Sequence, residues 1–279
     1  MKIEDVMSTD LIVGYVPGTV TDALKILAKH NVSGMPIVKK GTKNVVGVLT
    51  RTDIFRNSDE EQLALIMSDK VYFVDKDQDI KDAAKLLFEK RIHGLPVINK
   101  RKNLIGIISP TDILKVLSKK KDDVVEKYFT NMVVPVYQDT PLNIVMEIIN
   151  ITNENALPVL DDELKLAGIV SDGDLFKLSH VRESVSRSDM GMGDDEDQWT
   201  WEGIRDTMRL YYSTSKVDLP TVPVKEVMVT GVIKAFKNTP ISKIAEDMIK
   251  NRISHMPVVD ASDRLIGMVT DIDLMACMF

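Results

Sequence analysis

A hydroxyl residue and an acid recur four times in this chain at one fixed spacing. In each of these repeats, numbered 1 to 4 in chain order, a Gly precedes two apolar residues, a Ser or Thr, two variable residues and an Asp. The pairs are Thr50 and Asp53, Ser109 and Asp112, Ser171 and Asp174, and Thr270 and Asp273. A carboxylate can accept hydrogen bonds from both hydroxyl groups of a ribose, and a helix start attracts phosphate through unpaired N–H groups. The motif therefore suits a nucleotide.

The same motif also has a purely structural interpretation. A Ser or Thr three residues before an acid at a helix start forms a capping box, which is the commoner meaning of a lone copy. Two observations favour a ligand instead. The acid is always Asp and never the longer Glu, which reaches back to the cap more easily, and the motif always closes an apolar strand. Both interpretations stay open.

A second polar set precedes a proline that lies in an apolar strand of each repeat. Repeats 2 and 4 are basic here, with Arg91 and His93 in one and Arg252 and His255 in the other, whereas repeat 1 has an Asn and a Ser and repeat 3 has two Asn residues. Such arginines could contact phosphate or could simply complement the dipole at a helix C-terminus. The histidines belong to different repeats, so nothing in their spacing predicts a metal site.

The proline strands are candidates for a base-binding slot. Small residues, Gly34, Gly94 and Ala156, stand two residues before the proline in repeats 1 to 3 and would let the backbone approach the edge of a base. Apolar neighbours such as Met35 and Leu95 could cover its faces, although ordinary core positions are the alternative. Repeat 4 departs from this pattern because His255 occupies the small position.

The elements that must position these residues can be predicted from periodicity in repeat 1. A helical turn over residues 3–7 and an extended run over 11–15 precede an amphipathic helix over 20–30. Two strands follow, over residues 35–39 and 45–49, joined by a turn at 40–43, and a second helix opens after Thr50. The expected fold class is therefore mixed α/β, with a β-α-β-β-α order in each unit.

The spacing of the motifs gives the domain plan. We expect repeats over residues 1–60, 61–120, 121–180 and 220–279, with an insertion over 181–219 between the last two. A unit of this size buries little surface alone, so the repeats should pair into two modules.

The insertion differs in composition from the rest of the chain. It contains an acidic run at residues 194–197, which indicates a flexible loop. Apolar residues then recur at helical spacing, at Trp201, Ile204, Met208, Tyr211 and Tyr212. They predict an extra helix that either packs on the second module or docks a partner.

The unit order, with the Gly-x-x-[Ser/Thr]-x-x-Asp motif after its third strand, resembles the cystathionine-β-synthase (CBS) domain family. The resemblance covers nearly the whole chain except the insertion. It implies that two repeats form one pseudo-two-fold module, with adenosine-containing ligands bound between repeats. Four repeats in one chain resemble the gamma regulatory subunits of AMP-activated protein kinase and stand-alone archaeal-type relatives.

The resemblance implies a regulatory, non-catalytic protein with AMP, ADP or ATP as its ligand, whose basic residues would meet phosphates. It also implies a protein partner, such as a kinase or another enzyme, and allows a homodimer. Repeat 3 has the acids Glu154 and Asp172 where cations would be needed, so we expect it to prefer an uncharged or monophosphate adenosine. S-adenosylmethionine binding, a ligand-free interaction scaffold and an unrecognised enzyme site are the alternatives.

Composition excludes several other classes. The chain has 279 residues, a net charge of -6 and one cysteine, which disfavour nonspecific nucleic-acid binding, an internal disulfide and a cysteine-based metal cage. It has no apolar run long enough for a membrane span and no signal-peptide pattern, so we expect a cytoplasmic protein. No P-loop, dinucleotide fingerprint or catalytic-nucleophile motif occurs, so no catalytic cofactor or enzyme activity is expected.

Overall fold

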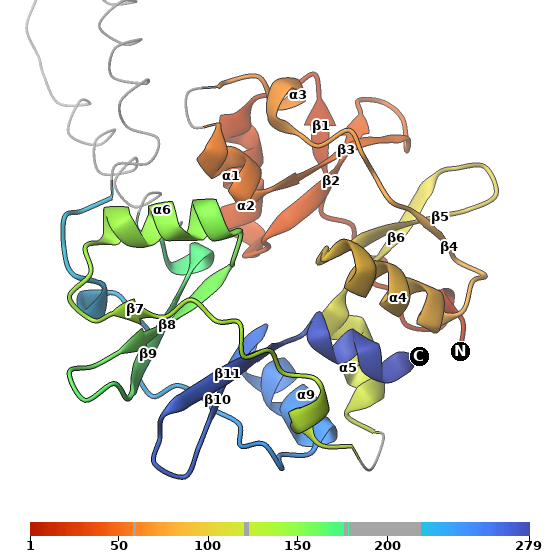
Figure 1. The fold of residues 1–279 in the computed structure, drawn as a ribbon. Coiled ribbons are helices and arrows are strands. Elements are labelled where there is room, and N and C mark those ends of the chain that lie inside the picture. Colours follow the sequence, from red (N-terminus) through yellow and green to blue (C-terminus); the bar gives the residue numbers. More distant parts are fainter. Residues whose placement is uncertain (58–59, 120–122, 176–177, 179–218) are drawn as a thin grey trace, which may run out of the picture.

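Repeat 1 shows how each unit is built. The computed structural model describes residues 1–57, 60–119, 123–175, 178 and 219–279, and it shows four similar units arranged around a ring (Figure 1). Repeat 1 comprises β1 (Gly14–Val16), α1 (Val20–His30), β2 (Gly34–Lys39), β3 (Val45–Thr50) and α2 (Arg51–Arg56). β1 runs parallel to β2, and β2 runs antiparallel to β3. The predicted β-α-β-β-α order and mixed α/β class are confirmed.

Local signals set the limits of α1 where the sequence predicts them. The helix begins after Thr19, whose side chain accepts a hydrogen bond from the backbone N–H of Asp22 at 3.1 Å. It ends at Asn31, which adopts the left-handed conformation with φ 50°. This is a common helix C-terminus, and Asn tolerates it well. The first strand is shorter than predicted, because pairing with β2 begins only at Gly14.

The other repeats follow the same plan. Repeat 2 comprises β4 (Val74–Asp75), α4 (Ile80–Lys90), β5 (Leu95–Ile98), β6 (Leu104–Ile108) and α5 (Pro110–Leu117). Repeat 3 comprises β7 (Val136–Tyr137), α6 (Leu142–Thr152), β8 (Ala156–Leu160) and β9 (Leu166–Ser171). Repeat 4 comprises α9 (Ile241–Asn251), β10 (His255–Val259), β11 (Leu265–Thr270) and the 3-10 helix η4 (Asp273–Met278). In repeat 4 a parallel bridge from Ala235 to Val258 takes the place of the first strand.

The leading segment of each unit packs against the strands of the unit with which it pairs. These segments contain short helical turns, η1 (Ile3–Asp5), α3 (Leu63–Ile66), η2 (Val125–Lys127) and η3 (Val224–Glu226). The segment before β1 bridges β6 at Ser8 and Ile107, and the segment before β4 bridges β3 at Ser68 and Val48. Repeats 3 and 4 exchange their segments in the same way. The predicted pairing into two modules, repeats 1 with 2 and 3 with 4, therefore rests on reciprocal exchange.

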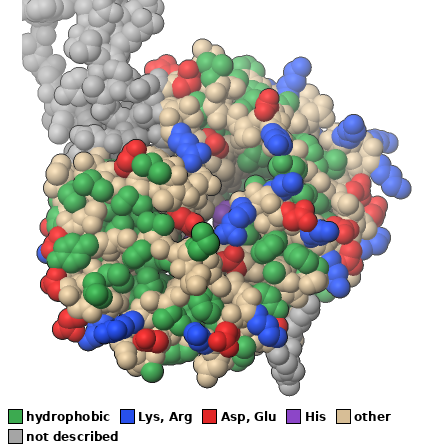
Figure 2. Space-filling model, in the orientation of Figure 1, with side chains coloured by type: hydrophobic (Ala, Val, Ile, Leu, Met, Phe, Trp, Pro, Cys, Tyr) green, Lys and Arg blue, Asp and Glu red, His purple; other side chains and the backbone are tan. Residues whose placement is uncertain are grey.

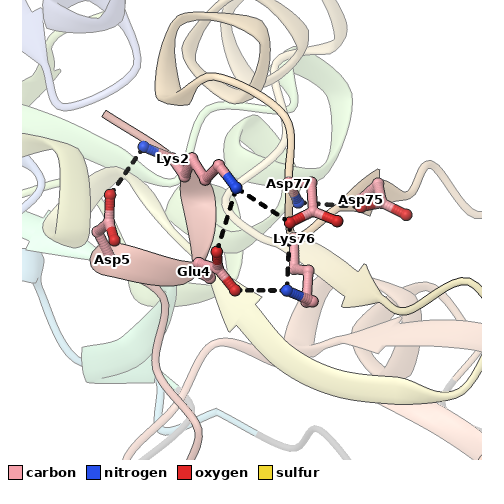
Figure 3. Close-up of polar contacts among 6 residues, drawn as sticks. All are labelled: Lys2, Glu4, Asp5, Asp75, Lys76 and Asp77. Carbon is pink, nitrogen blue, oxygen red and sulfur yellow. Dashed lines mark hydrogen bonds and ion pairs between the residues drawn. The ribbon is translucent and has the colours of Figure 1, made fainter.

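Polar contacts fasten the first exchanged segment to repeat 2 (Figure 3). The Lys76 ammonium lies 2.5 Å from Glu4, and the Lys2 ammonium lies 3.3 Å from Asp77. The backbone N–H of Glu4 also donates to the carbonyl of Lys76 at 3.1 Å. The ammonium groups are half-exposed, so the ion pairs contribute little by themselves, and the backbone bonds set the register.

Segment exchange explains the glycine of each motif. A Cβ atom at Gly267 would lie 2.4 Å from the carbonyl oxygen of Thr130 and 2.3 Å from the Phe129 ring. At Gly106 and Gly168 the exchanged segment approaches as closely, through Met7 and Met228. A side chain at this position would displace the neighbouring repeat's segment.

The hydrophobic cores cross from one module to the other. One cluster of buried residues joins repeats 2 and 4, through Leu87, Ile113, Ile244 and Met275 among others. A second cluster joins repeats 1 and 3, through residues that include Leu27 and Ile149. The order around the ring is therefore 1, 2, 4, 3 (Figure 1). No helix among the described residues is long and apolar enough to cross a membrane.

Candidate functional site

The fold brings the two predicted halves of the site together within each repeat. Strand pairing places Gly34 opposite Thr50, Ala156 opposite Ser171, and His255 opposite Thr270. The small position before the proline therefore lies beside the hydroxyl residue of the motif. The chain just upstream is held there as well, because the backbone N–H of Asp271 donates to the carbonyl of Ser254 at 2.8 Å.

The motif acid completes a capping box in every repeat. The Asp53 Oδ2 atom accepts from the backbone N–H of Thr50 at 2.8 Å and from its hydroxyl at 2.6 Å. The corresponding oxygens of Asp112, Asp174 and Asp273 accept from the N-cap N–H at 2.9–3.0 Å. Asp therefore reaches back to the cap in every repeat, so its presence in place of Glu does not favour a ligand over capping.

The second carboxylate oxygen distinguishes the repeats. In repeat 4 the Oδ1 atom of Asp273 accepts from Arg91 at 3.1 Å, and in repeat 2 the Oδ1 atom of Asp112 accepts from Lys115 at 3.1 Å. Within the described part of the chain, the Oδ1 atoms of Asp53 and Asp174 have no hydrogen-bond partner. Capping uses only one oxygen of each acid, so a ligand hydroxyl can still use the other.

Repeats 2 and 4 face each other across the middle of the ring with basic and acidic groups. Besides the pair of Arg91 and Asp273, the His93 Nε2 atom lies 3.7 Å from the Asp271 Oδ1 atom. That oxygen is buried and has no hydrogen-bond partner among the described residues. Next to it, the His255 Nδ1 atom lies 2.9 Å from the Ser254 hydroxyl. Figure 2 shows a histidine and basic side chains gathered near the centre of this face.

Repeats 1 and 3 meet with a related but different set of groups. Arg56 donates to the Asn150 carbonyl and to the Asn153 side chain, both at 3.1 Å. The guanidinium of Arg51 lies over Gly173, where a Cβ atom would be 2.7 Å from Nη1. Burial raises the pKa of Asp172, and the positive charge of Arg51 acts in the opposite direction and lowers it.

Comparison with known proteins identifies the repeats. The CBS domain family matches residues 3–60, 62–119, 125–181 and 224–279. The chain belongs to the CBS domain family. Its similarity to solved structures extends over the whole ring, so the predicted resemblance is confirmed for both the family and the fold.

Two proteins match this chain over most or all of their length. Protein MJ1225 of Methanocaldococcus jannaschii is 26% identical over 94% of this chain and 92% of that protein. Its crystal structure, proposed as an archaeal homologue of γ-AMPK, has a TM-score of 0.79 at 24% identity and covers 100% of both chains. A conserved protein from Pyrococcus horikoshii has a TM-score of 0.67 at 24% identity, again over 100% of both chains.

Other relatives match only part of this chain. The inosine-5'-monophosphate dehydrogenase of M. jannaschii is 30% identical over 115 residues, which are 41% of this chain and 23% of that enzyme. A match to less than a quarter of that enzyme carries no activity over to this chain.

The CBS repeats differ at the residue that ends their central helix. Asn31 and Asn153 occupy this position in repeats 1 and 3, and Arg91 and Arg252 occupy it in repeats 2 and 4, all in the left-handed conformation with φ between 49° and 58°. Asn tolerates this conformation, whereas a long side chain does not favour it. The arginines therefore lie at the helix C-cap itself, where their side chains can project from the end of the helix.

Burial sets the charge of the groups at the centre of the CBS ring. Burial, followed by the charges of His93 and Arg91, lowers the pKa of His255 to about 3, and burial together with Arg91 also lowers the pKa of His93. Burial raises the pKa of Asp271 to about 7. Both predicted histidines are therefore neutral near pH 7, and the expectation that His255 adds a cation to repeat 4 is wrong for the ligand-free protein.

The predicted base-slot residues fall into two classes. Gly34 and Gly94 are partly exposed, whereas Met35 and Leu95 are 2% and 0% exposed and belong to the two cores. Ala156 is also buried. The side chains of Met35 and Leu95 therefore hold the CBS strands together and are not available to cover a base.

Of the residues that directly follow the four hydroxyl residues, sequence reasoning singled out only Asp172 of repeat 3. This position holds Arg51, Pro110, Asp172 and Asp271 in the four CBS repeats. In three of them the side chain faces the opposite module, as shown by the contacts of Arg51 with repeat 3 and of Asp271 with His93. The only sequence signal was its change of charge between repeats. Within the described residues, no group of three His, Cys, Asp or Glu side chains is placed to hold a metal.

Proposed function

We propose that this CBS protein is a non-catalytic regulatory protein that binds adenine nucleotides, AMP, ADP or ATP, at its four motifs. The observation that carries the proposal is the meeting of Arg91 with Asp273, at 3.1 Å, across the two modules. A nucleotide needs an acceptor for its ribose and a cation for its phosphate within one molecule's length. These two groups, from different repeats, supply that pair.

Each set of residues has a distinct role in this proposal. The ribose would bind the hydroxyl–acid pairs, which keep one carboxylate oxygen outside the capping box. Phosphate would bind Arg91 and Arg252, with His93 and His255 as neutral hydrogen-bonding groups. The base would lie against the backbone at Gly34, Gly94 and Ala156, next to the hydroxyl residues.

S-adenosylmethionine is a second candidate, favoured by two acids near the centre of the ring. Asp172 and Asp271 follow the hydroxyl residues of repeats 3 and 4, and burial raises the pKa of both. A polyphosphate brought beside them would meet like charge once they ionise, whereas a sulfonium cation would be attracted. This observation favours a less anionic ligand in repeats 3 and 4.

A bound nucleotide would act on a partner through the junction between the modules. Since Arg91 and Asp273 belong to opposite modules, a ligand that engages both would alter how the modules meet. We infer a cytoplasmic role as a sensor for a protein kinase or another enzyme. The similarity to MJ1225, proposed as a homologue of γ-AMPK, supports this inference.

Thermal unfolding with added ligand tests the proposal. Protein stripped of co-purified ligand would be titrated with AMP, ADP, ATP and S-adenosylmethionine in parallel. A ligand at 100 times its dissociation constant should stabilise the folded state by about 2.7 kcal/mol per site, and so raise the melting temperature. Calorimetric titration would give the number of sites. No heat and no change in melting temperature with any of the four ligands would overturn the proposal.

A further inference from the structure

The outward face of α6 differs from that of the equivalent helix in every other repeat. In α1, α4 and α9 the third residue is Asp22, Asp82 or Lys243, and the tenth residue is Lys29, Glu89 or Lys250, all exposed. In α6 the same positions hold Ile144 and Ile151, which are 48% and 75% exposed. The three other helices thus serve as internal controls, and among the four helices only α6 has apolar residues at its third and tenth positions.

These isoleucines belong to one continuous stripe. Ile148, which is partly buried, lies between them, so the three side chains follow the spacing i, i+4, i+7 of one helix face. The opposite face of α6 is already buried in the core through Val145 and Ile149. Contiguous exposed apolar side chains on a helix mark a surface that another segment covers.

The size of the stripe argues for an occupant from the same chain. A stable contact between separate molecules buries about 800 Å² on each partner, far more than three side chains offer. A tethered segment needs much less area, because its effective concentration is high. Both described residues that flank positions 179–218, Leu178 and Leu219, pack with the same core cluster as α6. The chain that follows Leu219 lies beside the start of this helix, because the backbone N–H of Leu142 donates to the carbonyl of Val222 at 3.0 Å.

The sequence of the undescribed stretch contains a matching apolar face. Trp201, Ile204, Met208 and Tyr211 recur at helical spacing, and Arg205 and Arg209 lie among them. The exposed carboxylate of Glu147 lies on α6 beside the isoleucine stripe. Tyr211 is eight residues before Leu219, a span of at most about 28 Å, so the tether on this side holds the segment close to the core.

We propose that residues 201–211 bind the stripe formed by Ile144, Ile148 and Ile151 on α6. The segment then covers the one central helix whose outward face is apolar. This proposal does not depend on the nucleotide ligand, because α6 carries the stripe on the face opposite to its core contacts.

Tryptophan fluorescence tests the proposal, since both tryptophans of the chain, Trp199 and Trp201, lie in or beside the segment. The double variant Ile144→Asp, Ile151→Lys gives α6 the outward residues of α1. We expect its tryptophan emission to shift to longer wavelength and its quenching by acrylamide to rise several-fold relative to the wild type. A matched control, Glu89→Lys, changes charge at the equivalent position of α4 and should leave emission and quenching unchanged.

Two further measurements keep the test decisive. Because the substituted isoleucines are exposed, the melting profile and circular dichroism of the double variant should show the same fold as the wild type. In a separate variant, cysteines in place of Ile151 and Met208 should form a disulfide within one chain under oxidation. Emission already typical of exposed tryptophan in the wild type, and unaffected by the α6 variant, would overturn the proposal. So would quenching that depends on protein concentration, which would assign the stripe to a second copy, or a disulfide found only between chains.

Discussion

The two junctions between modules use one backbone plan with different charges. Where repeat 2 meets repeat 4, arginine occupies the left-handed helix end and Arg91 binds the motif acid Asp273 of the opposite module. Where repeat 1 meets repeat 3, asparagine occupies that position and Arg56 instead binds the end of α6. The motif acids of repeats 1 and 3 therefore keep an oxygen without a partner among the described residues. Repetition preserves the frame, while single side chains decide which motifs are linked to the other module.

The motif acids provide the largest expected difference between the two junctions. Replacing Asp53 or Asp174 by Ala should weaken nucleotide binding by about 1.5–3 kcal/mol at one site, the usual cost of a lost hydrogen bond to a charged group. Asp273→Ala should cost less affinity, because in the wild type a ligand must first displace Arg91 from Asp273. Calorimetric titration of each single variant checks this order.

The same variants separate ligand binding from capping. Loss of the capping box should lower the stability of the ligand-free protein by about 1 kcal/mol. A large loss of stability with unchanged affinity would show that the motif only caps its helix. An equal loss of affinity in all variants would remove the difference between the junctions.

Buried acids should give the two junctions different pH dependence. Burial raises the pKa of Asp271 to about 7, so between pH 4 and 7 the folded protein holds a proton that the unfolded chain has lost. This group therefore makes stability fall as the pH rises through that range. Asp271→Asn should remove the effect and raise the melting temperature at pH 8 more than at pH 4. Asp172→Asn should change the melting temperature less, because Arg51 already offsets part of the effect of burial on the pKa of Asp172.

His255 should give the opposite trend at the same junction. Its pKa falls from the ordinary 6.5 to about 3, so the unfolded chain takes up protons first and stability is lost as the pH falls through that range. The other titratable or charged groups that face this pair are Arg91, His93 and Asp273. The melting temperature of the Asp271→Asn variant should therefore rise more steeply between pH 4 and 8 than that of the wild type. Unchanged slopes would contradict the assignment.

The arginines at the helix ends should favour ligands with more phosphate. Arg91→Ala and Arg252→Ala should each weaken the binding of ATP by about 1 kcal/mol more than the binding of adenosine. The difference should shrink with added salt, because these side chains are exposed. Titrations of both ligands at two salt concentrations measure this. Asn31→Ala and Asn153→Ala at the other junction serve as matched controls. Equal losses for ATP and adenosine would leave the arginines with a role in helix capping only.

The smallest expected effect comes from the left-handed backbone itself. Arg252→Asn should stabilise the ligand-free protein by about 0.5–1 kcal/mol, because Asn tolerates φ of 54° better than Arg does. Among the described residues Arg252 has no ion-pair partner to lose. Asn153→Arg should show the converse loss, and chemical denaturation would measure both. A destabilised Arg252→Asn protein would mean that the arginine makes a stabilising contact.

Local sequence was sufficient for the parts of the molecule that depend on neighbours in the chain. The limits of α1, the hairpin of β2 and β3 and the four-fold repetition followed from periodicity and the recurring motif, and the unit order with that motif carried the resemblance to the CBS family. The motif acid and the small strand position were also predicted together, because both lie at the ends of paired strands. The predicted insertion over residues 181–219 lies outside the described residues except for Leu219, which is buried.

Only the tertiary structure decided how the repeats exchange segments and which repeats face each other. Contacts of Arg91 with Asp273 and of His93 with Asp271 join residues about 180 positions apart, which no local pattern reports. The tertiary structure also decided charge. His255 and Asp271 look like an ordinary cation and anion in the sequence. Burial lowers the pKa of His255 and raises the pKa of Asp271, which favours the neutral form of each. Sequence determined which chemical groups each repeat carries, and packing between repeats determined which of them meet and whether they are charged.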